Sequence, residues 1–388
     1  MIDRTLIEEV ATDLLPTVVE IRRAIHQHPE LSGEEYRTTE VISTALRTYG
    51  LTPRVRTPKP GLILDVGPSG PLVGFRSDLD ALPIQEPVGL DFASQRPGVM
   101  HACGHDAHAA IGLGLALAMD RLALPARFRF LFQPAEETFP GGAFELVREG
   151  AVEGLEAILA FHVDPSLDTG RVGLKTGAIT SSADRFYVTL EGPGGHTARP
   201  HATVDIIHAA GQVVSQLPAM LDRMVDARSP LALVFGKIHG GTADNVIPTT
   251  VDLSGTVRTA DRRLWDEIPS LVERVIHQIA EPFGAKAIVH YQRGLPPVVN
   301  DARVIQRLEH TVSGLLGDEA VMSTYLSMGA EDYSRYLEEV PGALVRLGCR
   351  SDDRTTTDLH ASNFRLDEEC LAVGLQVGIA ALAELALG

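Results

Sequence analysis

The chain has 388 residues, which is more than one hydrophobic core usually covers, and we therefore expect two domains. Its content of 44% hydrophobic and 22% charged residues is typical of a soluble globular protein. The formal net charge of −17 disfavours nucleic acid and anionic membranes as partners.

The cysteines and the first residues of the chain indicate a reducing compartment. Cys103, Cys349 and Cys370 are too widely separated to form a disulfide framework. Residues 1–4 lack the basic-then-apolar layout of a signal peptide, and we expect no apolar run of membrane-spanning length. We therefore predict a cytoplasmic protein.

Two helices are expected at the start of the chain. Apolar residues recur at helical spacing over residues 5–28, and we interpret His26 and His28 there as surface or packing residues. A second helix is expected from about residue 33 to residue 49, with Ser32 as its cap and Glu35 three residues further on.

Two strands, residues 62–66 and 72–75, follow and are separated by a turn. The second strand leads into Asp78 and Asp80. In open α/β sheets, sites are built beyond the carboxyl ends of strands. The alternative, in which the two carboxylates only end the strand and cap a turn, is equally compatible with the pattern.

Residues 100–108, with the sequence Met-His-Ala-Cys-Gly-His-Asp-Ala-His, carry the strongest chemical signal. They offer one thiol and three imidazoles beside a carboxylate, the side chains that a transition-metal site uses. Because one stretch supplies only part of a coordination sphere, the other ligands should come from elsewhere. A helix is expected over about residues 105–121.

Two further strands end in residues that could complete such a site. The strand over residues 126–132 leads to Glu136 and Glu137, so that one carboxylate could bind a metal while the other takes a proton. The strand over residues 157–163 carries His162 near its end. The alternatives are a solvated glutamate pair and a hydrogen-bonded core histidine.

The order of elements changes near residue 181 and indicates an inserted domain. The order βαββαβ is that of a ferredoxin-like sandwich. We therefore predict a discontinuous catalytic domain, residues 1–182 and 297–388, and an insert, residues 183–296. The expected elements of the insert are strand 184–191, helix 204–217, strands 231–239 and 250–259, helix 264–282 and strand 286–291. The expected elements after it are a helix opened by residues 328–333, strand 344–347 and helix 367–387.

The ordered motifs of the chain resemble the amidohydrolase branch of the M20 metallopeptidases. This resemblance implies an α/β catalytic domain with a mixed, largely parallel sheet flanked by helices and a site for two divalent metal ions. It also implies that the insert is a ferredoxin-like α+β lid that forms a homodimer. The motifs are residues 101–106, Glu136-Glu137, His162, residues 194–196, residues 329–332 and Leu359-His360.

The same resemblance implies roles for single residues. It implies Glu136 as general base and His196 as the lid histidine that reaches across the dimer to stabilise an oxyanion. The implied metal ligands are Cys103, His105, Glu137, His162 and His360. The implied substrate-binding residues are Asn245, Arg258 and Gly329, and the residues implied to orient ligands are Asp80 and Asp106.

We therefore expect a metal-dependent amidohydrolase that cleaves N-acyl amino acids or related small amides. The donor set suits zinc and also allows manganese, cobalt or nickel. Two alternatives stay open: a metal-free amidase that uses Cys103 as nucleophile, and a non-catalytic binding module on the same scaffold. Arg258 could also be a surface residue at the end of a strand.

Overall fold

The structure is a computed structural model that describes residues 2–87, 89–351 and 357–388. It divides into two compact units, the first up to Gly177 with Val299–Tyr325 and Asp332–Gly388, and the second of Ala178–Val298 with Leu326–Glu331. The second unit is thus slightly larger than the predicted insert. Its added segments are joined by the hydrogen bond from the Ser181 N–H to the Gly329 carbonyl, at 3.2 Å.

An eight-stranded mixed sheet forms the centre of the first unit, in the order β1-β2-β4-β3-β5-β16-β6-β15. Strands β4, β3, β5 and β16 are parallel neighbours, whereas β1, β2 and β6 add antiparallel pairs. The strands are β1 (Arg54–Val55), β2 (Leu62–Val66), β3 (Leu72–Asp78), β4 (Arg127–Gln133), β5 (Ala157–Asp168), β6 (Val172–Leu174), β15 (Val321–Ser323) and β16 (Gly342–Arg350).

The two strands expected around the turn at residues 67–71 are not neighbours. β4 lies between them and pairs with β2 antiparallel and with β3 parallel. In the second pairing Asp78 lies opposite Gln133. The residues that follow β3 and β4 therefore leave the sheet at one edge, where side chains from distant parts of the chain meet.

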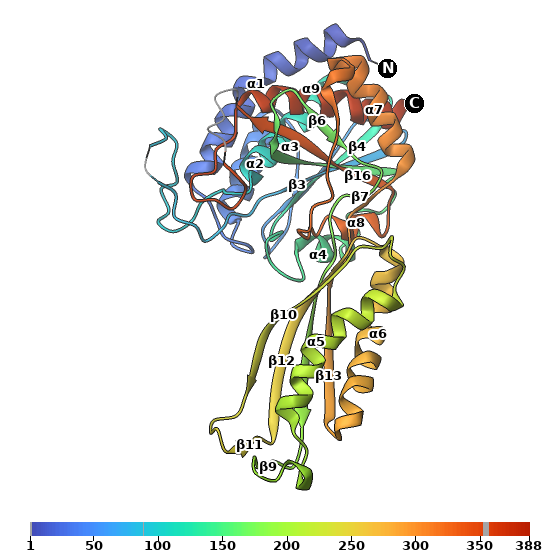
Figure 1. Cartoon of the computed structure of the whole chain (residues 1–388). Coiled ribbons are helices and arrows are strands. Elements are labelled where there is room, and N and C mark those ends of the chain that lie inside the picture. Colours follow the sequence, from blue (N-terminus) through green and yellow to red (C-terminus); the bar gives the residue numbers. More distant parts are fainter. Residues whose placement is uncertain (1, 88, 352–356) are drawn as a thin grey trace. The chain divides into compact units, whose positions relative to one another are not determined.

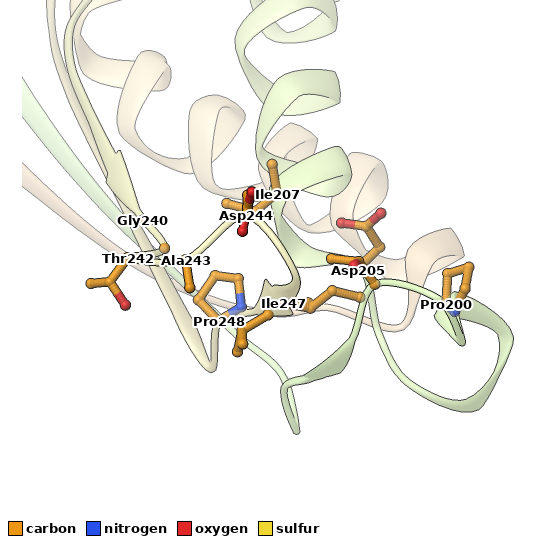
Figure 2. Close-up of a pocket in the computed structure, with 12 residues that line it drawn as sticks. Pro200, Asp205, Ile207, Gly240, Thr242, Ala243, Asp244, Ile247 and Pro248 are labelled. Atoms are coloured by element: carbon orange, nitrogen blue, oxygen red, sulfur yellow. The ribbon is translucent and has the colours of Figure 1, made fainter.

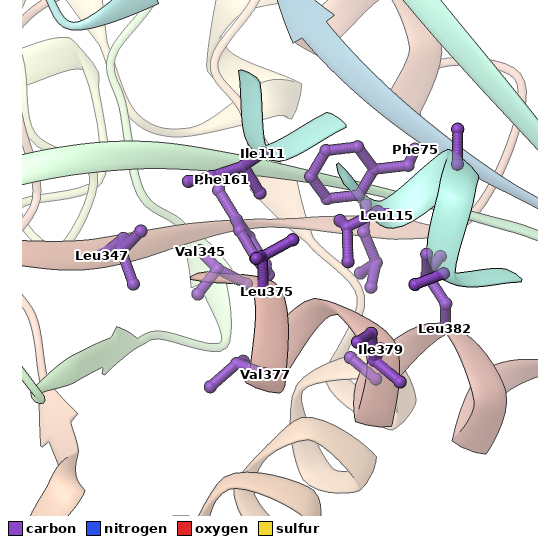
Figure 3. Packing of buried hydrophobic residues seen from close by; sticks show 14 of the residues in the cluster. Phe75, Ile111, Leu115, Phe161, Val345, Leu347, Leu375, Val377, Ile379 and Leu382 are labelled. Carbon is purple, nitrogen blue, oxygen red and sulfur yellow. The ribbon is translucent and has the colours of Figure 1, made fainter. Parts of the chain in front are cut away.

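Helices of the first unit flank this sheet. α3 and α9 contact its strands, α1 packs on both of them, and α4 and α8 pack against each other (Figure 1). Residues from strands and helices interdigitate in the core, where the rings of Phe75 and Phe161 meet edge to face at 5.2 Å (Figure 3). The helices are α1 (Arg4–Gln27), α2 (Tyr36–Thr48), α3 (His105–Leu122), α4 (Gly142–Arg148), α7 (Ala302–Leu316), α8 (Ser334–Leu337) and α9 (Glu369–Leu387).

Helix α9 corrects one expectation from the sequence. With 19 residues of apolar composition it is long enough to cross a membrane, so the expectation that no such run exists was wrong. In the structure 72% of its apolar window is buried. It packs against α1, α3 and α7. This burial is typical of a core helix in a globular protein.

The second unit has the strand order of a ferredoxin-like sandwich. Its four-stranded antiparallel sheet has the order β10-β12-β8-β13. α5 and α6 pack on each other and on this sheet (Figure 1). The elements are β8 (Ala183–Glu191), α5 (Ile206–Met224), β10 (Leu231–Gly240), β12 (Thr250–Thr259), α6 (Arg262–Ala280) and β13 (Lys286–Leu295), with short strands β9 (Gly195–His196) and β11 (Val246–Ile247).

Two local predictions differ from the structure. α2 begins at Tyr36 and Glu35 precedes it without a side-chain cap, because Ser32 instead donates a hydrogen bond to Asp80, at 2.7 Å. The helix expected to open at residues 328–333 is the short α8, which begins only at Ser334. The remaining short elements are β7 (Gly177–Ala178), β14 (Val299–Asn300) and the 3₁₀ turns Pro200–Ala202, Glu281–Phe283 and Asp318–Ala320.

Candidate metal centre and active site

The five predicted metal ligands come together in the first unit. Ligand atoms of Cys103, His105 and His162 lie within 4.8 Å of one another, and so do those of Cys103, Glu137 and His360. The Cys103 Sγ lies 3.6 Å from His162 Nε2, and His360 Nε2 lies 3.1 Å from Glu137 Oε1. The side chains thus form two groups of three that share Cys103.

The buried imidazoles are oriented for metal binding. His162 Nδ1 donates to the Val163 carbonyl at 2.8 Å, and His105 Nδ1 donates to the Asp80 carbonyl at 2.9 Å. Each ring therefore directs Nε2 away from its backbone partner, and the buried His105 Nε2 has no hydrogen-bond partner among the described residues. An orphaned, buried ring nitrogen beside a thiol fits a transition metal.

For His162, electrostatics support the same interpretation. Burial and the positive charge of Arg346 lower the pKa of His162 well below its usual value, so this imidazole is in the neutral form that metals bind. Burial raises the pKa of Cys103 to about 12. Without a cation beside it the thiol therefore stays protonated, which disfavours a free thiolate nucleophile.

Tight backbone geometry places Cys103 and His105. Gly104 between them has φ +84°, and a Cβ at that position would lie 2.3 Å from Cγ2 of Val163. Glycine is therefore required for both conformation and space. His360 also has a positive φ, +62°, and its N–H donates to the Ala102 carbonyl at 2.8 Å. This bond ties the last predicted ligand to the motif at residues 100–108.

Asp80 connects the ligand side chains to one another. Its Oδ1 lies 3.2 Å from His105 Nδ1, and its Oδ2 accepts from the Glu137 N–H at 2.9 Å. Burial acts to raise the pKa of Asp80, but the hydrogen bond and charge of His105 outweigh it and the pKa is lowered. Asp80 therefore does more than cap a turn, because it holds a histidine and the loop of Glu137 together.

His108 and Asp78 are fixed in a neighbouring hydrogen-bonded chain. Asp78 accepts from His108 Nδ1 at 2.7 Å and from Arg76 at 2.6 Å. His108 Nε2 in turn accepts from the Val163 N–H at 2.9 Å. Both ring nitrogens of this third motif histidine are thus engaged, and its role is to hold the strand end that carries His162.

Asp106 does not contact a predicted ligand. Its Oδ2 accepts from Arg22 Nε and from His26 Nδ1, each at 2.9 Å. The expectation that Asp106 orients a metal ligand therefore has no contact to support it. The carboxylate instead joins α1 to α3, and His26 is a buried packing residue, as we interpreted it. Arg22 belongs to no motif of the sequence, and its contact with Asp106 was not predicted.

Glu136, the predicted general base, lies at this site. The sequence did not predict the backbone conformation of the residue before it. Ligand-type atoms of Glu136, Glu137 and His105 lie within 4.8 Å of one another. Ala135, just before them, has φ +57°, and its N–H donates to Oε1 of Glu35 at 2.7 Å. Glu35 is fully buried. The sequence pattern indicated it only as part of a helix cap.

The predicted residues of the second unit form two pairs. At one end, His196 in β9 lies opposite Val246 in β11, and the Asn245 carbonyl accepts from the Thr197 N–H at 3.3 Å. At the other end of β12, Arg258 donates to the carbonyl of Met328 at 2.6 Å, beside Gly329. The sheet thus separates His196 and Asn245 from Arg258 and Gly329.

A pocket of about 570 Å³ lies at the His196 end of this unit (Figure 2). It is formed by the turn that follows β10 and by the start of α5. Asp205 and Asp244 supply its carboxylates, and Ile207, Ile247 and Pro248 supply apolar surface. Asn245 belongs to the same turn.

Known proteins resemble this chain in sequence and in fold. A model of peptidase family M20/M25/M40 matches residues 74–384. The chain is 40% identical to an N-acyl-L-amino acid amidohydrolase of Geobacillus stearothermophilus, over 76% of this chain and 80% of that protein. It is 38% identical to an N-acetyl-L-cysteine deacetylase of Bacillus subtilis, over 91% and 84%.

A solved structure has the same fold. The crystal structure of the Bacillus subtilis YXEP protein, a dinuclear metal-binding peptidase from the M20 family, aligns with a TM-score of 0.85 and 33% identity, over 97% of this chain and 99% of that chain. A Rhodococcus jostii relative, 43% identical over 94% of this chain, is longer, and the chain spans 46% of its length.

Proposed function

Because the chain belongs to peptidase family M20/M25/M40 and is a metal-dependent amidohydrolase, we propose that it hydrolyses the amide bond of N-acyl amino acids or related small amide conjugates. The observation that carries this proposal is the pair of ligand groups that share Cys103 and lie beside Glu136. An N-acetylated cysteine is one candidate substrate, since a relative carries that activity in its name.

Two divalent cations fit the donor set. His105 and His162 would hold one ion and Glu137 and His360 the other, with Cys103 common to both. One thiolate and three imidazoles suit zinc, and the carboxylate also allows manganese, cobalt or nickel. When bound, the two ions supply positive charge that lowers the pKa of a water molecule and polarises the scissile carbonyl.

Glu136 serves as the general base in this proposal. It lies beside the ligands without being needed to complete either group of three. Its carboxylate takes a proton from the attacking water and returns that proton to the departing amine. His196 would stabilise the negative charge that develops on the carbonyl oxygen, and Asn245, Arg258 and Gly329 would bind the rest of the substrate.

We also propose a homodimer formed through the second unit. The eight steps of β12 from Thr250 to Arg258 span about 26 Å, so the pair His196 and Asn245 lies farther from Arg258 than a small N-acyl amino acid can reach. A site that binds one substrate molecule with residues of both pairs therefore needs the second unit of another copy of the chain. The edge strand β10 exposes Val234 and Ile238 and could provide the interface.

A cytoplasmic location is part of the proposal. Its support is that all three cysteines are free and buried in the structure. Free thiols are typical of a reducing compartment.

The test is hydrolysis of a panel of N-acyl amino acids, including N-acetyl-L-cysteine, by the purified protein before and after chelation. Zinc, manganese, cobalt and nickel are then restored separately. We expect chelation to abolish activity and one ion to restore it. Activity that survives chelation but is lost on thiol alkylation would instead make Cys103 the nucleophile. Metal binding without turnover of any amide would favour a binding module.

A further inference from the structure

A buried carboxylate lies behind the loop of the proposed base. Glu35 is 0% exposed although it stands outside every motif of the chain. Its Oε1 accepts a hydrogen bond of 2.7 Å from the backbone N–H of Ala135. Carboxyl groups are rarely buried completely unless a specific partner holds them. The partner here is the residue directly before Glu136.

The backbone of Ala135 is held in an uncommon conformation. Its φ of +57° is in the left-handed region, which costs a residue with a Cβ about 1 kcal/mol or more. Such a conformation persists only where surrounding contacts fix it. The N–H of Ala135 is fixed by Glu35, and its carbonyl accepts from the Gly142 N–H at 2.9 Å. The direction in which the chain enters Glu136 and Glu137 depends on this residue.

The short segment that carries Glu35 also contacts Asp80, which follows the end of strand β3. Ser32, three residues before Glu35, donates to Asp80 Oδ2 at 2.7 Å. That oxygen accepts the N–H of Glu137 as well, at 2.9 Å. The loop of Glu136 and Glu137 is therefore held on one side by Glu35 and on the other side by Asp80.

We propose that Glu35 is a positioning residue for hydrolysis: by accepting the Ala135 N–H it keeps that residue left-handed and so directs the carboxylate of Glu136 toward the attacking water. This inference rests on the proposed role of Glu136 as base. Glu35 itself has no contact with substrate in this proposal and transfers no proton.

The acceptor atom, and not the charge, is what this role requires. Burial, together with the negative charge of Asp80, raises the pKa of Glu35 to about 7. A glutamine has the same length and offers a carbonyl oxygen to the Ala135 N–H. An aspartate keeps the carboxyl group but is one methylene too short to reach it.

The two substitutions therefore separate positioning from charge. We expect Glu35→Gln to keep kcat within about threefold of the wild type. We expect Glu35→Asp to lower kcat by up to about 100-fold, the loss that a displacement of about 1 Å at a reacting group can produce. KM and the metal content of Glu35→Asp should stay near wild-type values, because Asp80 still holds the backbone N–H of Glu137 and no substrate contact is changed.

A matched control comes from the same segment. The side chain of Glu30 accepts from the N–H groups of Arg37 and Thr38 at the start of α2, so Glu30→Asp shortens a carboxylate without touching Ala135. We expect it to leave kcat unchanged. Equal kcat in Glu35→Asp and wild type, a loss explained by lost metal, or a larger loss in Glu35→Gln than in Glu35→Asp would each overturn the proposal.

The failure of this inference is distinguishable from failure of the proposed function. Glu136→Gln is measured in parallel. If that variant stays active, Glu136 is not the base and the proposed mechanism fails. If Glu136→Gln is inactive while Glu35→Asp turns over at the wild-type rate, only the positioning role of Glu35 fails.

Discussion

At the scale of single residues, the site separates metal binding from proton transfer. Glu136 lies beside the ligands but is not needed in either group of three. We expect Glu136→Gln to retain the full metal content and to lower kcat by about 10²- to 10⁴-fold, the usual contribution of a general base. Elemental analysis and kinetics on the same preparation check this. Substantial remaining activity would show that another group takes the proton.

Cys103 should behave in the opposite way. Because it belongs to both ligand groups, Cys103→Ala should lower the occupancy of both metal positions and abolish turnover together with metal content. Cys349→Ala is the matched control, since Cys349 is also a buried free thiol but lies in neither group. A Cys103→Ala enzyme that keeps two metal ions per chain would contradict the assignment.

The meeting of side chains could be predicted from the sequence where chemistry and spacing coincide. Cys103 and His105 share one motif, and Glu137 and His162 lie near strand ends, so their meeting could be predicted. Glu35 could not be recognised, because its role depends on a hydrogen bond to Ala135, far away in the sequence. The contacts of Asp106 could not be recognised either, because its partners lie on α1.

At the scale of elements, the turn into α3 depends on Gly104. An alanine there would need φ near +84° and would clash with the buried Val163. We expect Gly104→Ala to lower the free energy of unfolding by about 2–4 kcal/mol and to reduce metal content. Gly314→Ala in α7 is the control, because open space surrounds that position, and it should be neutral or stabilise by up to about 1 kcal/mol. Equal melting temperatures of the two variants would contradict the predicted clash at Gly104.

The contact between α1 and α3 should make stability depend on pH. Burial alone would lower the pKa of His26, but the charge of Asp106 and hydrogen bonds to Asp106 and Glu86 raise it to about 9. Because the folded pKa exceeds the ordinary value of about 6.5, the stabilisation is complete below pH 6.5 and is lost as the pH rises through about 9. Denaturant unfolding should show a fall of up to about 3 kcal/mol across this window. His26→Gln should remove it, and an unchanged pH profile in that variant would exclude His26 as its source.

Most elements could be predicted from periodicity, whereas their arrangement could not. The strands of residues 62–66 and 72–75 were recognised, but β4 separates them, and long-range pairing leaves no local pattern. The cap expected at Ser32 was lost to Asp80, a tertiary contact that replaced a local one. The βαββαβ order of residues 183–296 could be predicted, because it is complete within one segment.

At the scale of the whole molecule, the proposed dimer can be tested on its interface. β10 is an edge strand whose Val234 and Ile238 are 60% and 59% exposed. Val234→Lys with Ile238→Lys should convert a dimer into a monomer by placing charge on an edge that would pair. Ile288→Lys on the opposite edge strand, β13, is the control. Light scattering that gives a monomer for the wild type, or a dimer for the double variant, would contradict this interface.

Activity in mixtures of variants tests whether one copy completes the site of another. The resemblance to M20 enzymes implies that His196 acts on the partner's metal site, and the distance along β12 between His196 and Arg258 supports a second copy. Glu136→Gln and His196→Ala should each be nearly inactive alone. After the two are mixed and exchange subunits, a mixed dimer has one site with both Glu136 and the partner's His196 intact. Activity should then recover to about one quarter of the wild-type value, because half of the dimers are mixed and each has one working site of two. A mixture as inactive as its parents, although subunit exchange is verified by mass, would place His196 at the site of its own chain.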